Sequence, residues 1–271
     1  MFGLSLIPSV LSSSSVVTAG SEGSRSPGYA NTHAIDLDGT GDLIKTFKSS
    51  DLQTFVRSDF SVSFWVKASS WQTFYLMGLD TTTGANTTAV FMRSLNIGAV
   101  YWQTSIKLGG VAFSGLAAAG TPSTSDYVHF VVTLRKGGAS TNGTFKLYVD
   151  GVEKISTNAS TGTEQDSTLV STPFVMPFGA YQSSGGSFSG HATATFDEIA
   201  MWTTALGASE VTALYNSGST FDISSDNGDY TSSAYLENWY RLNNDLTNSG
   251  TSTVVAQTEG DPAFVTTPTP P

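Results

Sequence analysis

The chain has 271 residues, of which 13% are charged, and its formal net charge is −10 at pH 7. Such an acidic chain offers no basic surface to a nucleic acid, and no apolar run reaches the roughly 18 residues that a helix needs to cross a membrane. Because the sequence contains no cysteine, disulfides and a cysteine nucleophile are excluded as well.

Residues 1–29 are predicted to form an N-terminal arm and linker. No Lys or Arg precedes the apolar start Met1–Leu11, and Pro8 interrupts it, which argues against a secretory signal peptide. The Ser-, Gly- and Pro-rich remainder cannot build a core of its own. We therefore expect this arm to bind neighbouring subunits, and we expect the same of the Pro-rich tail, Pro262–Pro271.

Residues 30–218 are predicted to form one all-β domain. Short runs of β-branched and aromatic residues recur between Gly-, Ser-, Thr- and Asp-rich turns. They predict strands near residues 33–38, 60–67, 73–79, 88–94, 97–102, 127–135, 144–150, 173–181 and 195–203. Asp150-Gly151 is typical of a hairpin turn between KLYV (146–149) and VEKI (152–155).

One short helix is predicted near residues 208–215, directly after the last of these strands. Val211, Leu214 and Tyr215 are spaced at i, i+3 and i+4, which gives the helix one apolar stripe to pack against a sheet. Glu210 at the third helical position can accept hydrogen bonds from the free backbone N–H groups of the first turn. Gly218 suits the left-handed position after the C-terminus of the helix. Residues 219–271 are predicted as a C-terminal extension with one strand, Ala234–Leu242, followed by the tail.

Several of these segments resemble the laminin G-like, concanavalin A-like jelly-roll family. The strand, turn and helix of Thr195–Gly218, TFDEIAMWTTALGASEVTALYNSG, are similar to the family's closing segment. The family's earlier strands are matched, in the expected order, by AIDLDGTGD (34–42), FSVSFWVK (60–67), YVHFVVTLR (127–135) and GTFKLYVDG (143–151). The resemblance implies a two-sheet antiparallel jelly-roll sandwich.

The order of motifs along the chain implies a setting for this domain. LENWYRLNNDLTNSG (236–250) is similar to an element that often opens such domains, but here it follows the helix, as in phage-encoded members of the family. We therefore expect a non-enzymatic structural protein of a bacteriophage virion, a homo-oligomeric capsid decoration or appendage subunit. It would assemble in the host cytoplasm, contact other virion proteins through its arm and tail, and face cell-surface glycans. The alternative is a secreted, extracellular bacterial lectin or carbohydrate-binding module of an adhesin.

Catalysis is the least favoured function. Glycoside hydrolases of this fold carry an E-x-D-x-(x)-E strand, which aligns carboxylates on one face. Glu164-Gln165-Asp166 begins such a motif, but no third carboxylate follows and the surrounding loop is rich in Ser, Thr and Gly. We expect the protein not to be an enzyme.

Calcium is the one cofactor that the sequence supports. Asp36, Asp38 and Asp42 imitate the start of an EF-hand loop, but its twelfth position is Phe47 instead of Glu. The family resemblance implies instead a structural Ca²⁺ held by Asp197 on the closing strand, with Asp36 or nearby backbone carbonyls as partners. In the alternative, Asp197 only caps backbone amides.

Three aromatic residues are candidates for stacking against a sugar. Trp71, Tyr101 and Trp102 lie near predicted loops or strand ends, whereas Phe64, Trp65 and Trp202 occupy strand positions typical of the core. A core or subunit-interface role for the first three stays open, because aromatic residues also anchor interfaces.

Overall fold

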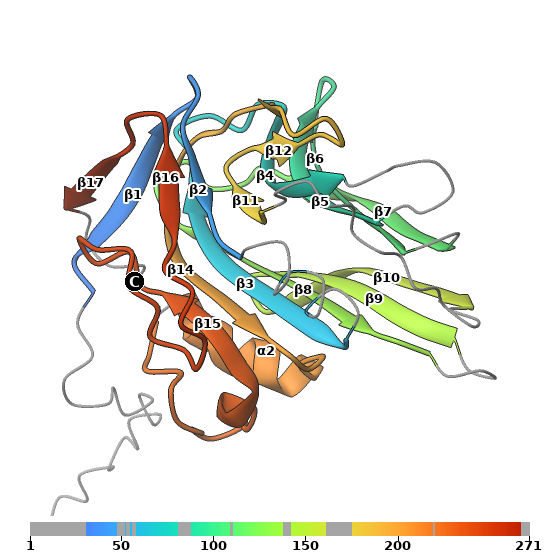
Figure 1. Cartoon of the computed structure of the whole chain (residues 1–271). Coiled ribbons are helices and arrows are strands. Elements are labelled where there is room, and N and C mark those ends of the chain that lie inside the picture. Colours follow the sequence, from blue (N-terminus) through green and yellow to red (C-terminus); the bar gives the residue numbers. More distant parts are fainter. Residues whose placement is uncertain are drawn as a thin grey trace, which may run out of the picture.

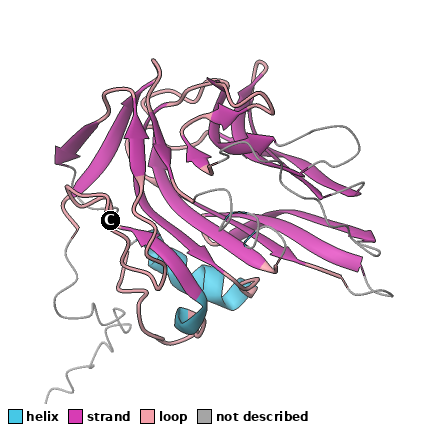
Figure 2. Cartoon of the chain, in the orientation of Figure 1, coloured by secondary structure: helices cyan, strands magenta, loops and turns pink. Residues whose placement is uncertain are grey.

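Two β-sheets packed face to face make up the protein (Figure 1). The computed structural model describes residues 31–47, 52, 55, 58–80, 88–108, 111–137, 142–160, 175–218 and 220–266. Strands dominate these residues, and the helix α2 (Ala208–Tyr215) lies against one outer side of the sandwich (Figure 2). The predicted all-β jelly-roll sandwich is confirmed.

The first sheet has the strand order β10-β9-β8-β3-β14-β1-β17, and β15 also pairs with β14. All of its pairings are antiparallel. Its strands are β1 (His33–Asp38), β3 (Phe60–Lys67), β8 (Val128–Arg135), β9 (Asn142–Val149), β10 (Val152–Ser160), β14 (Thr193–Trp202), β15 (Leu236–Tyr240) and β17 (Ala263–Thr266).

The second sheet has the order β16-β2-β11-β4-β5-β6-β7, with β12 joining β4 and β13 joining β12. Its pairings are antiparallel apart from the single parallel pair of Gln182 in β12 with Leu79 in β4. Its strands are β2 (Leu43–Lys45), β4 (Phe74–Asp80), β5 (Thr88–Asn96), β6 (Val100–Leu108), β7 (Val111–Gly120), β11 (Pro177–Phe178), β12 (Tyr181–Gln182), β13 (Phe188–Ser189) and β16 (Gln257–Glu259).

The main core lies between the inner faces of the two sheets. Alternate residues of each strand point into it, as the period of two requires. Phe64 of β3 is fully buried, with its ring centroid 5.7 Å from that of Phe130 on the neighbouring strand and 5.4 Å from that of Phe178 on the opposite sheet. Burying one such side chain stabilises the fold by about 1.5–3 kcal/mol, so these rings hold the two layers together.

A second core lies on the outer side of the first sheet, under α2. Val211 and Leu214 of the helix pack with Trp202 of β14 and with Trp239 of β15. The helix begins as predicted, because the Gly207 N–H donates to Glu210 Oε2 at 2.9 Å. Its end differs in part: Asn216 takes the left-handed conformation at the C-cap, with φ 43°, and Gly218, two residues later, is also at positive φ, 92°. The first sheet is therefore covered on both sides in this region.

The C-terminal extension contributes more to the sheets than the sequence predicts. The predicted strand at Ala234–Leu242 is present as β15, but β16 and β17 are additional. β16 pairs with β2 in the second sheet, and β17 pairs with β1 in the first. β7 is another strand that the sequence analysis missed. Within the described part of the chain, none of the helices is both long and apolar enough to span a bilayer.

Candidate carbohydrate-binding surface and metal site

Trp71 and Trp102, two of the three predicted sugar-stacking residues, are core residues, so this part of the prediction is wrong. Their side chains are 4% and 2% exposed. The two rings meet edge to face with centroids 5.0 Å apart, and Trp71 Nε1 donates to the Ser123 carbonyl at 2.8 Å. The cause is strand phase: Trp102, like Thr104 and Ile106, occupies an inward position of β6. Neither indole face is open to a sugar.

Tyr101, the third candidate, lies on the opposite side of the same strand. Because neighbouring residues of a strand alternate between faces, Tyr101 and Gln103 point away from the core, and both are partly exposed. In register, Tyr101 lies between Leu95 of β5 and Ala118 of β7. Its role in sugar binding stays a prediction, but its position satisfies the first requirement, an aromatic ring on an outer face.

Three further aromatic rings gather on this outer face, and the sequence analysis did not find them. The Tyr75 and Tyr181 rings stack with centroids 4.7 Å apart, and Phe91 meets Tyr75 edge to face at 5.8 Å. Arg93 lies between Tyr75 and Gln103 in the sheet register. We call this partly exposed group the Arg93 surface; its members are Tyr75, Phe91, Arg93, Tyr101, Gln103 and Tyr181.

Two glycines allow the tyrosines to lie flat on the sheet. A Cβ at Gly78 would lie 2.7 Å from Tyr181 Cδ2, and one at Gly190, where φ is +63°, would lie 2.6 Å from Tyr75 Cδ2. Any larger residue would lift the rings, because real Cβ atoms do not approach so closely. Tyr181 is further fixed by its hydroxyl, which donates to Asp80 Oδ2 at 3.0 Å. Burial, and then this bond to Asp80, raise the pKa of Tyr181, so the hydroxyl stays a donor at neutral pH.

A cleft of about 350 Å³ lies away from the Arg93 surface, where β7, β8 and the β9–β10 hairpin meet. Trp102 reaches it, together with Tyr127 and Tyr215, and its charged lining residues are Asp126, Asp150 and Lys154. Tyr127 is only 8% exposed and the Tyr215 ring is stacked on Trp65, with centroids 6.0 Å apart. Of the aromatic rings in this cleft, Trp102 and Tyr127 are therefore buried and Tyr215 is partly exposed.

Asp197 lies in a buried polar site formed by a β-bulge. The pairing of β14 with β3 shifts register between Asp197 and Ala200, and Glu198 takes a left-handed φ of 50°. The bulge allows two consecutive carboxylates to face one point, which a regular strand forbids. Asn31 Nδ2 occupies that point, 2.9 Å from Asp197 Oδ1 and 2.7 Å from Glu198 Oε1.

The Asn31 amide faces more oxygens than it has hydrogens. Asn31 Nδ2 is also 2.6 Å from the Arg241 carbonyl oxygen, but an amide NH₂ has two hydrogens for these three oxygens. Two other donors reach the carboxylates: Trp239 Nε1 donates to Glu198 Oε2 at 2.6 Å, and the Glu198 N–H donates to Asp197 Oδ1 at 2.9 Å. Asp197 Oδ2 is buried and has no hydrogen-bond partner among the described residues. Burial, and then the charge of Glu198, raise the pKa of Asp197 well above its ordinary value. A hard cation would satisfy this set of oxygens, and reversal of the Asn31 amide would add its own oxygen to them.

Asp36, the predicted partner of Asp197, lies elsewhere. It is exposed, it pairs in register with Thr195, and its Oδ1 accepts from Thr195 Oγ1 at 2.9 Å. In the described part of the chain, the one group of three or more carboxylate, His or Cys ligands within 4.8 Å of each other is Asp38, Asp42 and Asp261. The backbone carbonyl of Arg241, and not Asp36, is the oxygen that accompanies Asp197 and Glu198.

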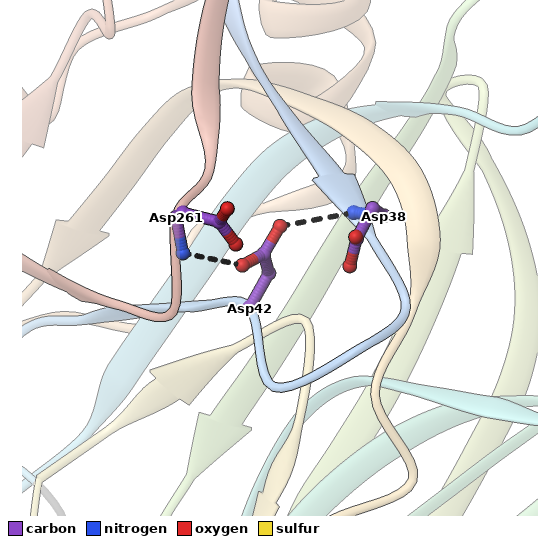
Figure 3. A group of neighbouring side chains, drawn as sticks. All are labelled: Asp38, Asp42 and Asp261. Atoms are coloured by element: carbon purple, nitrogen blue, oxygen red, sulfur yellow. Dashed lines mark hydrogen bonds between the residues drawn. The ribbon is translucent and has the colours of Figure 1, made fainter.

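The group of Asp38, Asp42 and Asp261 is explained by backbone capping (Figure 3). Asp42 is 1% exposed, and both of its carboxylate oxygens accept from backbone amides. Oδ2 accepts from Asp38 N at 3.1 Å and Oδ1 from Asp261 N at 2.9 Å (Figure 3). Asp42 therefore ties the turn after β1 to the segment between β16 and β17, a structural role that needs no ion.

The sequence model of the concanavalin A-like lectin/glucanases superfamily matches residues 38–212, more than half of the chain. The chain belongs to this superfamily. The match contains the closing strand β14 and the start of α2, so the family resemblance is confirmed. The search of curated proteins gives no match.

Solved structures of low sequence identity share the superfamily fold. A proposed carbohydrate-binding protein from Bacteroides ovatus is 13% identical, with a TM-score of 0.58 over 89% of this chain, which spans 62% of that protein. A heptameric SAP-like pentraxin from Limulus polyphemus is 11% identical, with a TM-score of 0.51 over 89% of this chain and 97% of its own. At these identities the likeness concerns the fold alone.

His129 is packed in the first sheet and hydrogen-bonded. It is 1% exposed, its Nε2 lies 2.7 Å from Ser63 Oγ, and burial lowers its pKa to about 3. The incomplete hydrolase motif, Glu164 to Asp166, lies outside the described residues, as do the predicted arm, residues 1–29, and residues 267–271 of the predicted tail.

Proposed function

We propose that this protein is a non-catalytic carbohydrate-binding domain that uses the Arg93 surface to hold a sugar. The observation that carries the proposal is the gathering of four aromatic rings, Tyr75, Phe91, Tyr101 and Tyr181, around polar groups on one outer sheet face. Apolar CH groups of a sugar ring pack on such rings, while amide, guanidinium and hydroxyl groups bond its hydroxyls. Membership of a superfamily of lectins and glucanases supports the same function.

Binding by one such surface is expected to be weak. A millimolar dissociation constant corresponds to about 4 kcal/mol, which a few partly exposed rings can supply. Several copies on one particle or cell would raise the avidity without any new contact. This domain would therefore act as one unit of a repeated surface.

Screening of a glycan array, followed by calorimetry on the best ligand, tests the proposal. We expect Tyr181→Ala and Tyr101→Ala each to weaken binding by roughly tenfold, about 1.4 kcal/mol. Tyr235→Ala is the matched control, because Tyr235 is 53% exposed but lies beside β15, on the other sheet. Equal binding by the unmodified protein and all three variants would contradict the proposal that the Arg93 surface binds the sugar. A loss confined to Tyr235→Ala would contradict it as well.

The setting that we propose is the virion of a bacteriophage, with the sugar-binding face turned outward. It is supported by the order of motifs, in which LENWYRLNNDLTNSG follows the helix, and by low-complexity segments at residues 1–29 and in the Pro-rich tail. The alternative, a bacterial carbohydrate-binding module or lectin, would use the same surface and is equally compatible with the fold.

We propose in addition that Asp197 and Glu198 hold a structural Ca²⁺ with the Arg241 carbonyl and the Asn31 amide oxygen. The support is the surplus of oxygens around one amide and the unsatisfied Asp197 Oδ2. The ion would supply positive charge to two buried carboxylates. It would stabilise the bulge of β14 and play no part in sugar binding.

A further inference from the structure

Arg93 is held in one orientation on the outer face of the second sheet. Its guanidinium carbon lies 5.6 Å from the ring centroid of Tyr75 and 5.8 Å from that of Phe91. Nε donates to Gln103 Oε1 at 2.5 Å, and Nη1 lies 3.5 Å from the Tyr75 hydroxyl. These contacts define the plane of the guanidinium before any ligand arrives, which lowers the entropy cost of binding.

The charge of Arg93 is not neutralised by the described residues. The ion pairs that they form are Lys45–Glu259 and Lys146–Glu153, and neither involves Arg93. A guanidinium has five N–H donors, and the bonds to Gln103 and Tyr75 use two of them. In a chain with 22 acidic and 12 basic residues, an oriented arginine that pairs with no carboxylate of the described residues is a site for an external anion.

We propose that Arg93 binds the carboxylate of an acidic sugar, such as a uronic acid, on the Arg93 surface. This inference rests on the proposed function and specifies its substrate class. A guanidinium matches a carboxylate in planar, two-point geometry, and the pair is stronger than a bond between neutral groups. The neighbouring rings of Tyr75, Phe91 and Tyr181 would pack on the pyranose, so one sugar residue can use both the charge and the apolar contacts.

The test compares oligosaccharides that differ only in charge. Galacturonate, glucuronate and mannuronate oligomers are each paired with the same oligomer after reduction of its carboxyl groups to primary alcohols. We expect the full-length protein to bind at least one acidic oligomer roughly tenfold more tightly than its reduced partner in calorimetry. The preference should weaken as salt is added, because partly exposed charges are screened.

Three variants assign that preference to the geometry of Arg93. Arg93→Gln should lose it, and Arg93→Lys, which keeps the charge but lacks the planar fork, should keep only part of it. Lys107→Gln is the matched control: Lys107 lies on the outer face of β6, four residues from Gln103, and its loss removes the same charge. Lys107→Gln should keep the full preference. Melting curves of all variants identify any that fail to fold.

The outcomes separate this inference from the proposed function. Equal binding of acidic and reduced oligomers, with both weakened by Tyr181→Ala, would overturn the role of Arg93 and leave carbohydrate binding intact. Loss of the preference in Lys107→Gln, or its full retention in Arg93→Gln, would also overturn it. A preference for sulfated over carboxylated sugars would contradict the proposal that Arg93 binds a carboxylate. Binding of no sugar at all would overturn both proposals.

Discussion

At the scale of single residues, the bulge at Asp197 and Glu198 is the feature with the largest expected effect on stability. It buries two neighbouring carboxylates, 0% and 6% exposed, in the first sheet. Buried carboxylates are costly unless they are protonated, paired or hydrogen-bonded, and Asp197 Oδ2 has no hydrogen-bond partner among the described residues. Calcium would remove that cost, and the effect can be measured as stability.

We expect added Ca²⁺ to raise the melting temperature of the protein and a chelator to lower it. Binding to the native state alone stabilises by about 2.7 kcal/mol at a hundredfold excess over Kd. Asp197→Asn should abolish the shift, whereas Asp36→Asn, which changes an exposed carboxylate outside the site, should keep it. Identical melting curves with calcium and with chelator would show that Asp197 only accepts hydrogen bonds from backbone amides and binds no calcium.

The same site predicts how the calcium effect depends on pH. The folded-state pKa of Asp197 is raised, so its protonation stabilises the metal-free fold at low pH, and that stability is lost as the pH rises through the raised pKa. Calcium binds the ionised form, so its stabilising effect should be large at neutral pH and disappear in acid. Melting curves with and without calcium between pH 4 and 8 measure this directly.

At the scale of elements, strongly patterned segments could be predicted from sequence and irregular ones could not. β14 and α2 follow from alternation and from the i, i+3, i+4 spacing of Val211, Leu214 and Tyr215. β7 has a weak signal because its residues Val111–Gly120 are rich in Ala and Gly, which have low β-propensity. β16 is short and exposed throughout, so no apolar alternation identifies it.

The candidate site was less predictable than the fold. Tyr75 and Tyr181 are 106 positions apart in the chain, and the pairing of β11 and β12 with β4 brings them together. Tyr101 was proposed together with Trp102 because both lie near a predicted strand end, but the phase of β6 that separates their faces depends on sheet packing. Asn31 and Arg241 reach Asp197 across 166 and 44 positions of sequence, which local patterns do not encode.

The two C-terminal strands should stabilise the sandwich. Deleting residues 257–271 removes β16 and β17, which pair with β2 and β1. It also removes the Asp261 N–H, which donates a hydrogen bond to Asp42 Oδ1. We expect a loss of roughly 2–4 kcal/mol in the free energy of unfolding, since each ladder hydrogen bond contributes about 1 kcal/mol. Chemical denaturation measures it, with deletion of residues 267–271 as the control. Equal stability of the two truncations would mean that β16 and β17 contribute nothing.

At the scale of the whole molecule, the two outer faces of the sandwich differ in their covering. α2 lies against the first sheet (Figure 1), and the segment around Trp239 packs with it. The Arg93 surface lies on strands of the second sheet. The two faces are therefore suited to different tasks. We propose that subunit contacts and the arm fix the domain on a particle and that the second sheet faces outward.

Incorporation into virions tests this arrangement. Mass spectrometry of purified phage particles should detect the protein at many copies per particle. Deleting residues 1–28 should leave the sandwich folded, because its described strands begin at His33, but should abolish incorporation. Normal copy number of the truncated protein would rule out the arm as the attachment segment, and absence of the full-length protein from particles would favour the bacterial alternative.

The position of β1 between β14 and β17 also has a consequence during translation. Asp38 ends β1, but Thr193, where β14 begins, is made 155 residues later, and Ala263, where β17 begins, 225 residues later. At roughly 5–20 residues per second on the ribosome, β1 waits about 8–30 s for its first partner and about 11–45 s for its second. During that time Ile35 and Leu37, which end up fully covered, have no sheet to join. We therefore expect the nascent chain, more than the finished protein, to depend on a chaperone that binds apolar strands.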